Sequence, residues 1–188
     1  LVFHDQRANH LHHSSGTVRF EPGAGVTQKL RYSYDGNAIY NAIVSGGASS
    51  DVRGFMSGDD YLTFTNDLTI DAGKIGTYGD KLRVTGNVVI NSGTLDTHTT
   101  NGATTPHSMG SLDIKADGTY NATAYTTNIT SRDDTDYGWK RNAAGTFDPN
   151  GGTVAFTYSD NSVYVVEDTF YNLTVDLPHA SYNELRYS

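Results

Sequence analysis

Histidines near the start of the chain are the first side chains whose type could bind a metal ion. His10, His12 and His13 stand close together, with His4 upstream. Imidazole nitrogens are common zinc ligands, but a stable site needs three or four ligands, and the spacing fixes no further one. We therefore weigh a metal site at His10 and His12 against an N-terminal arm, residues 1–15, that packs on a neighbouring subunit.

Aspartates form a second group with possible metal chemistry. Asp133, Asp134 and Asp136 follow one another closely, and Asp59 and Asp60 form a smaller pair. Oxygen-rich loops can hold Ca²⁺, but neither cluster has the alternating acidic loop with a terminal glutamate that typifies such sites. We expect solvated turns here, with Ca²⁺ as the alternative and no other cofactor.

Paired carboxylates could also hydrolyse or cleave a polysaccharide. Asp113, Asp117, Asp133 and Asp136 are the candidates, and such a reaction needs an acid and a base about 5–9 Å apart. Basic residues lie nearby without a characteristic spacing: Lys115, Arg132, Lys140 and Arg141. The sequence has no recognisable Ser/His/Asp order, phosphate-binding loop or nucleophile elbow. We therefore expect no catalytic residue and rank an enzyme last.

Aromatic residues are better candidates for binding. Tyr120, Tyr125, Tyr137 and Trp139 lie in or beside the segment 125–144. On the surface they could stack on a sugar ring or fill a pocket of the next subunit. The alternative is that they cover the edge of the core.

Asn-X-Ser/Thr sequons mark three further positions, Asn121, Asn128 and Asn172. Each is a possible N-glycosylation site in a secreted protein. A chain rich in Asn and Thr also produces such triplets by chance, and Asn172 falls in a predicted strand.

A repeat of 20 residues indicates the elements that would position these side chains. The segment 61–75 aligns without a gap on 81–95, and 110–120 is a third copy with one inserted residue. Within each copy the apolar residues alternate, which is typical of strands with one buried face. Asn, Asp and Gly separate the strands, as turns require.

Stacked coils explain this repeat best. In a right-handed parallel β-solenoid, or β-helix, with coils of about 20 residues, equivalent positions form vertical ladders. The predicted ladders pair Leu62 with Leu82, Ile70 with Ile90, Asp67 with Asn87, and Asp71 with Asn91. The alternative is an antiparallel β-sandwich, whose strands also alternate but need not repeat side chains at a fixed register. The chain has room for about eight to nine such coils.

A longer repeat relates the two ends of the chain. Residues 16–20 return as 152–156, and residues 38–44 return as 169–175. We expect the solenoid to occupy 16–176, with 177–188 as a C-terminal tail or inter-subunit strand. Related coils at both ends suggest stacking between copies.

Composition excludes several classes of partner. The formal net charge is −8, so no basic surface for nucleic acid is expected. The chain has no cysteine and therefore no disulfide framework. No apolar run approaches the ~20 residues that would span a membrane. Only 36% of residues are hydrophobic, which suits a thin core with many polar turns.

Three phrases resemble the repeats of large prokaryotic and phage surface proteins of the right-handed β-helix type. They are residues 86–95, 147–156 and 169–175, and the resemblance extends over about 16–44 and 60–176. The segments 45–59 and 125–144 depart from the pattern and are expected to be loops or insertions.

The resemblance implies a structural or binding role and supplies no catalytic residue. The first hypothesis is a subunit of an extracellular filament, surface layer or virion appendage that self-assembles through strand edges, as a homo-oligomer or open polymer. The second is an adhesin or tail-fibre segment that binds a surface glycan or receptor. A polysaccharide-degrading β-helix enzyme is the third. Each of these places the protein outside the cell, at the cell surface or on a virion.

Overall fold

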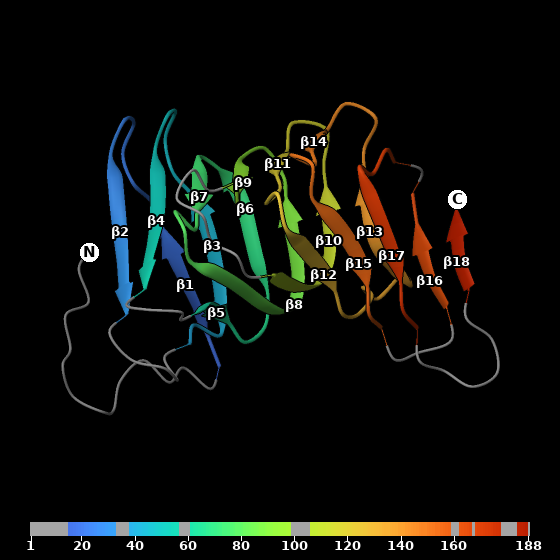
Figure 1. The fold of residues 1–188 in the computed structure, drawn as a ribbon. Helices are drawn as coiled ribbons and strands as arrows, with labels where there is room; N and C mark the ends of the chain where they lie inside the picture. Colours follow the sequence, from blue (N-terminus) through green and yellow to red (C-terminus); the bar gives the residue numbers. More distant parts are fainter. Residues whose placement is uncertain are drawn as a thin grey trace.

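The computed structural model describes residues 15–32, 38–56, 61–98, 106–158, 162–166, 168–177 and 184–187. These residues form an all-β parallel solenoid of about six turns, as the repeat predicts. The coils follow one another along a rod, with the N-terminal coil at one end and the C-terminal coil at the other (Figure 1). The described strand pairs are parallel, which excludes the antiparallel sandwich. Whether the coil is right-handed stays a prediction.

Each coil contributes strands to three columns, which we call A, B and C. Column A contains β5 (Tyr61–Phe64), the first half of β8 (Lys81–Ile90), the first half of β10 (His107–Ile114), β12 (Thr126–Ile129), β15 (Thr153–Phe156) and β17 (Asn172–Val175). Column B contains β1 (Thr17–Phe20), β3 (Asn41–Ser45), β6 (Leu68–Ala72), the second halves of β8 and β10, β13 (Tyr137–Arg141), β16 (Ser162–Val165) and β18 (Glu184–Tyr187). Column C contains β2 (Thr27–Tyr32), β4 (Asp51–Met56), β7 (Lys74–Gly76), β9 (Thr94–Asp96), β11 (Thr119–Asn121) and β14 (Thr146–Asp148).

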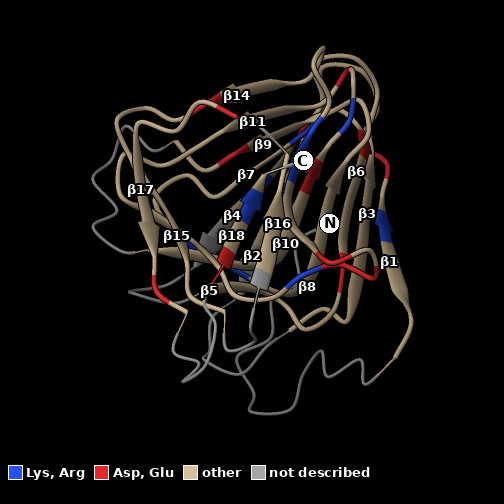
Figure 2. Cartoon of the chain, turned by 90° about the vertical axis from the view of Figure 1, so that its right-hand side faces the viewer, with Lys and Arg blue, Asp and Glu red and all other residues tan. Residues whose placement is uncertain are grey.

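Columns A and B belong to one 12-stranded sheet, and column C is a separate 6-stranded sheet. The two columns join because β8 and β10 are each long enough to pair with two strands along one edge. The first half of β8 pairs with β5 and its second half with β6. Viewed along the rod, the columns enclose the interior of the coil (Figure 2).

The predicted aliphatic ladders are confirmed. Leu62 pairs with Leu82 and Ile70 with Ile90, and all four side chains are fully buried. Alternation within each strand points every second side chain inward, so equivalent positions of successive coils meet in the core. The core therefore grows by addition of one layer per coil.

The predicted coil length is correct for only part of the chain. Ladder partners are 20 positions apart between β6 and β8, as expected. They are 24 apart between β1 and β3 and 27 apart between β12 and β15. Turns of different length lie outside the ladders, so they can grow without disturbing strand pairing. Longer coils also explain why about six turns form rather than eight or nine.

The segments expected to be loops or insertions contain strands. β4 lies within 45–59 and pairs with β2 and β7, and β12 and β13 lie within 125–144 and pair with β10. The expectation was wrong because these strands do not present aliphatic side chains alone to the core. Thr127 and Trp139 occupy inward positions where other coils carry Leu or Val.

Polar side chains form a further ladder at the corner between columns A and B. Asn41 Oδ1 accepts the Asp67 N–H at 3.2 Å, and Asp67 Oδ1 accepts the Asn87 N–H at 2.7 Å. Asn87 Oδ1 in turn accepts the Ser111 hydroxyl at 2.7 Å. The predicted turn pairs are thus confirmed, since Asn91 Nδ2 also donates to Asp71 Oδ1 at 2.8 Å.

Both predicted terminal segments lie mostly outside the described residues. His4, His10, His12 and His13 belong to the undescribed part of the predicted arm 1–15, so their metal site stays a prediction. Within 177–188, β18 pairs with β16 of the same chain in column B. Part of the predicted tail is therefore a strand of the solenoid itself.

Candidate functional site

Two of the four aromatic candidates lie in the core. Trp139 and Tyr120 are fully buried, so neither can stack on a glycan or enter a neighbour's pocket. The Trp139 ring centroid lies 4.8 Å from that of Phe147 and 5.2 Å from that of Phe170. Tyr120 stacks on Phe147 at 5.8 Å. The prediction of exposed contacts is wrong for these two residues because the last coils use aromatic rings as core filling.

Tyr137 and Tyr125 are the two remaining aromatic candidates. Tyr137 is half-buried, and its ring centroid lies 5.5 Å from that of Tyr164 in the next coil. Tyr125 is 40% exposed. A glycan contact at Tyr125 stays a prediction.

The sequons differ in accessibility. Asn172 is exposed, whereas Asn121 and Asn128 are half-buried. Asn128 Nδ2 donates to the carbonyl oxygen of His107 at 3.3 Å, so this amide nitrogen is engaged in an inter-coil hydrogen bond. Glycosylation stays a prediction at all three positions.

The acidic cluster forms a turn held by donors of the same chain. Asp133 Oδ1 accepts the Thr135 N–H at 2.9 Å and the Tyr137 N–H at 3.0 Å, and Asp133 Oδ2 contacts the Lys140 ammonium. Burial alone would raise the pKa of Asp133, but these hydrogen bonds outweigh it and lower that pKa. Asp136 pairs with Arg132 at 2.8 Å, and Asp134 is exposed.

Calcium is therefore not needed to explain this turn. The cluster was predicted to be a solvated turn, and the contacts of Asp133 show how it is held. Among the residues that the structure describes, no three His, Cys, Asp or Glu side chains come together as metal ligands would. Binding of Ca²⁺ stays a prediction.

Two of the carboxylates considered for polysaccharide cleavage, Asp113 and Asp133, form ion pairs with lysines. Asp113 Oδ2 lies 2.6 Å from Lys115 Nζ and 3.3 Å from Lys140 Nζ, and Lys140 also contacts Asp133. Asp117 is exposed and lines a different surface, a groove across several coils. The structure brings Asp113 and Asp133 together around one ammonium group, an arrangement typical of a structural ion pair.

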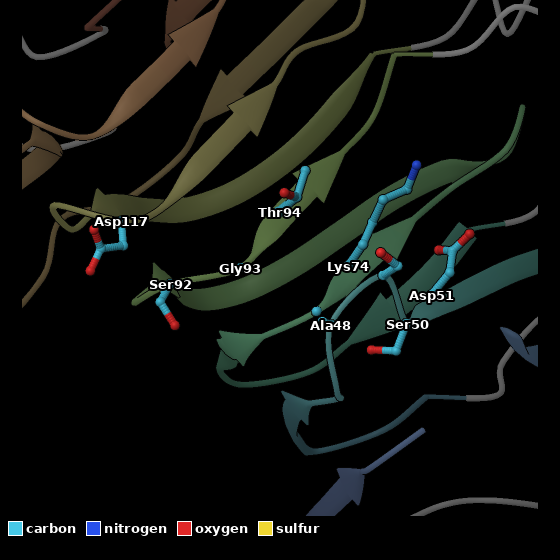
Figure 3. A pocket seen from close by; sticks show the side chains of 10 residues that line it. Ala48, Ser50, Asp51, Lys74, Ser92, Gly93, Thr94 and Asp117 are labelled. Atoms are coloured by element: carbon cyan, nitrogen blue, oxygen red, sulfur yellow. The ribbon is translucent and has the colours of Figure 1, made fainter. Parts of the chain in front are cut away.

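The groove lies along one edge of the solenoid, where turns of successive coils carry small side chains (Figure 3). Two of its three charged residues are paired, Asp51 with Arg53 at 2.6 Å and Lys74 with Asp96 at 2.8 Å, and the third is Asp117. Burial alone would lower the pKa of Lys74, but Asp96 and Tyr78 together outweigh it and raise that pKa, so the ammonium stays charged. No aromatic side chain lines the groove among the described residues. It offers hydroxyl groups and small side chains to a ligand.

The C-terminal end of the solenoid differs from the groove in exposing apolar side chains. Leu173 and Val175 of β17 are 38% and 43% exposed, and Tyr171 beside them is 69% exposed. The same phrase occurs earlier in the chain as β3, where Ala42 and Val44 are 1% and 0% exposed. Those two residues are covered because β6 pairs with β3 on its outer edge.

Open strand edges occur at both ends of the described structure. β17 ends column A and pairs on one side with β15, and β1 begins column B and pairs on one side with β3. The described residues place no strand on the other side of either. An edge with unpaired backbone groups is a template for a further strand. These ends were predicted as interaction surfaces from the long repeat, and they are the candidate functional site.

Helices are absent from the described part of the chain, so it contains none that could cross a membrane. No family model matches the chain, and no curated protein or solved structure matches it.

Proposed function

We propose that this protein is a structural subunit of an extracellular filament, surface layer or virion appendage that assembles by stacking solenoid ends. The observation that carries this proposal is the exposure of Leu173 and Val175 on an open strand edge, at positions whose counterparts in β3 are buried. The two open ends lie at opposite ends of the rod, as Figure 1 shows. A contact between unlike ends does not close on itself, so it generates an open polymer.

The ion pairs of the candidate carboxylates support a building role over a catalytic one, and other features support a location outside the cell. The carboxylates considered for cleavage chemistry are separated or neutralised, with Asp113 and Asp133 sharing Lys140. The three phrases that resemble prokaryotic and phage β-helix surface proteins support a place outside the cell, at its surface or on a virion. A chain without cysteine and with a net charge of −8 is compatible with that location.

The proposal is tested by light scattering and electron microscopy of the purified protein over a range of concentrations. We expect ordered polymers whose length rises with concentration. Tyr171→Asp places a charge at the exposed end and should shorten or abolish the polymers. Tyr125→Asp is the matched control, since Tyr125 is also an exposed tyrosine but directly precedes β12, which lies two strands in from β17. Particles that stay single at every concentration would refute the proposal.

A glycan-binding adhesin or tail-fibre segment remains the second candidate. The observations that favour it are the exposure of Tyr125 and the hydroxyl-lined groove. A glycan array with the wild type and Tyr125→Ala tests this reading. Binding that is lost in the variant while assembly is retained would support it, and the absence of binding by the wild type would exclude it.

A further inference from the structure

The two ends of the solenoid are built in the same way. Thr17 of β1 pairs with Asn41 of β3, and Thr153 of β15 pairs with Asn172 of β17. In both pairs the asparagine N–H donates to the glycine carbonyl before the threonine, at 3.2 Å for Gly16 and 3.3 Å for Gly152. The repeated segments, 16–44 and 152–175, therefore share the register of their strand pairing as well as their residue types.

The repeated strands lie in different columns. β1 and β3 belong to column B, whereas β15 and β17 belong to column A. The next strands shift in the same direction, because β2 and β4 pair in column C and β16 and β18 pair in column B. The second occurrence of the unit is therefore turned by one column relative to the first.

Each open edge has a counterpart inside the chain that shows what it accepts. β15, the counterpart of β1, carries β12 on the edge that is open in β1. β3, the counterpart of β17, carries β6 on the edge that is open in β17. A contact between β17 of one copy and β1 of the next would satisfy both edges at once.

The register of that contact follows from the internal pairs. Thr126, Thr153 and Asn172 lie in one row across β12, β15 and β17. If Asn172 takes the place relative to β1 that Thr126 has relative to β15, it lies beside Thr17. Leu173 then lies beside Val18.

The corner ladder is compatible with this register. Asn41 Oδ1 accepts the N–H of Asp67, and the following residue, Leu68, pairs with Ala42. In the proposed contact, Thr17 takes the place of Asp67 beside Asn172, and the following residue, Val18, pairs with Leu173. Val175 would meet Phe20, so the two exposed apolar residues of β17 would be buried, as their counterparts in β3 are.

Resting on the proposed function, we infer that a second copy of this chain is the occupant of the open end. Its β1 adds to β17 as a parallel strand, with Asn172 beside Thr17, and each copy is turned by one column relative to the last. The occupant is a second copy because the chain itself carries both edges, and the counterparts of these edges inside the chain, on β15 and β3, each accept a parallel strand.

Cysteine cross-linking tests the register directly, because the chain has no cysteine of its own. The variant carrying Thr17→Cys and Asn172→Cys is oxidised after assembly and separated under non-reducing conditions. We expect a ladder of covalent multimers that collapses on reduction. The variant carrying Thr153→Cys and Asn172→Cys calibrates the method, since this pair is adjacent within one chain and should close an intramolecular bond.

The matched control carries Thr17→Cys and Thr174→Cys. Thr174 lies on the same exposed face of β17 but two residues further along. With a rise of about 3.3 Å per residue and strands about 4.8 Å apart, its Cα would lie about 8 Å from that of Thr17, beyond the reach of a disulfide. A ladder in the control but not in the test variant would overturn the inferred register.

Microscopy of the same samples separates the two proposals. Polymers that form without the Thr17–Asn172 cross-link would overturn this inference and leave the proposed function intact. Single particles at every concentration would mean that another part of the chain or another protein covers the end, and would overturn both.

Discussion

Trp139 Nε1 donates a hydrogen bond to Asp168 Oδ2 at 2.8 Å inside the last coils. Arg141 Nε donates to the other oxygen, Oδ1, at 2.9 Å, and only 3% of the Asp168 side chain is exposed. One carboxylate therefore satisfies a buried indole and a partly buried guanidinium from column B.

Asp168→Ala should strongly destabilise the C-terminal coils. The substitution leaves the Trp139 indole N–H and the Arg141 charge without their acceptor, which costs about 2–4 kcal/mol of unfolding free energy. Urea unfolding followed by tryptophan fluorescence reports this region directly, because Trp139 is the only tryptophan. Asp134→Ala is the matched control, since Asp134 is exposed, and it should change stability by less than about 0.5 kcal/mol. Equal effects of the two variants would contradict this role for Asp168.

The aliphatic ladder predicts coupling between coils. Ile70→Ala and Ile90→Ala each create a cavity in a fully buried layer and should each cost about 2–5 kcal/mol. Because the two residues are direct ladder partners, the double variant should depart from additivity by about 0.5–3 kcal/mol. Thermal or urea unfolding of the four proteins measures this departure. Strict additivity would mean that the layers do not touch in solution.

His107 predicts a loss of stability at mildly acidic pH. Its Nδ1 accepts the Leu82 N–H at 2.9 Å, which requires the neutral ring, and its Nε2 has no partner among the described residues. Burial lowers the pKa of His107 to about 4. In the unfolded chain the pKa is about 6.5, so between these values the unfolded state binds more protons. Stability should therefore fall as pH drops from about 6.5 to 4, by about 3 kcal/mol in total from this residue.

The measurement is the urea midpoint between pH 4 and 7 for the wild type and for His107→Asn. Asparagine retains a side-chain acceptor for the Leu82 N–H but does not titrate, so this part of the pH slope should vanish. His98→Asn is the control, because it removes an exposed histidine and leaves His107 in place. A wild-type midpoint that is constant over this range would refute the prediction.

The repeat at 61–75 and 81–95 was sufficient to predict the solenoid and its ladders. Matching apolar residues at a fixed register leave few other ways to bury every second side chain. The column position of β12 and β13 could not be predicted, because Thr127 and Trp139 break the aliphatic pattern and look like loop residues. Pairing with a neighbouring coil overrides that local signal, since parallel strands need backbone partners more than a particular side chain.

The burial of the aromatic residues could not be predicted from the sequence either. Trp139 and Tyr120 lie far apart in sequence from Phe170, and only the stacking of three coils brings their rings together. Asp168 was missed for the same reason, because nothing around it in the sequence points to Trp139. The open ends, in contrast, were predictable from the repeat of 16–44 in 152–175, although the shift by one column was not.

Gly93 lies in a turn between columns B and C that has no room for a side chain. A Cβ at Gly93 would lie 2.5 Å from Ile70 Cγ2 and 2.7 Å from the carbonyl oxygen of Gly73 in the coil before it. That oxygen accepts the Thr94 N–H at 2.8 Å, so the two coils cannot separate without stretching a hydrogen bond between them. Gly93→Ala should therefore cost about 1–3 kcal/mol, by overpacking rather than by backbone strain.

Gly23→Ala provides the comparison that separates crowding from the general effect of replacing glycine. A Cβ at Gly23 would meet only Val26 Cγ2, at an ordinary contact distance of 3.6 Å, and alanine there reduces the freedom of the unfolded chain. We expect Gly23→Ala to be neutral or slightly stabilising in the same thermal unfolding measurement. If Gly93→Ala were as well tolerated as Gly23→Ala, the backbone of Gly73 could not lie as close to Gly93 as the 2.7 Å between its carbonyl oxygen and the added Cβ implies. The spacing between coils, which also sets the β17–β1 contact, would then need to be larger.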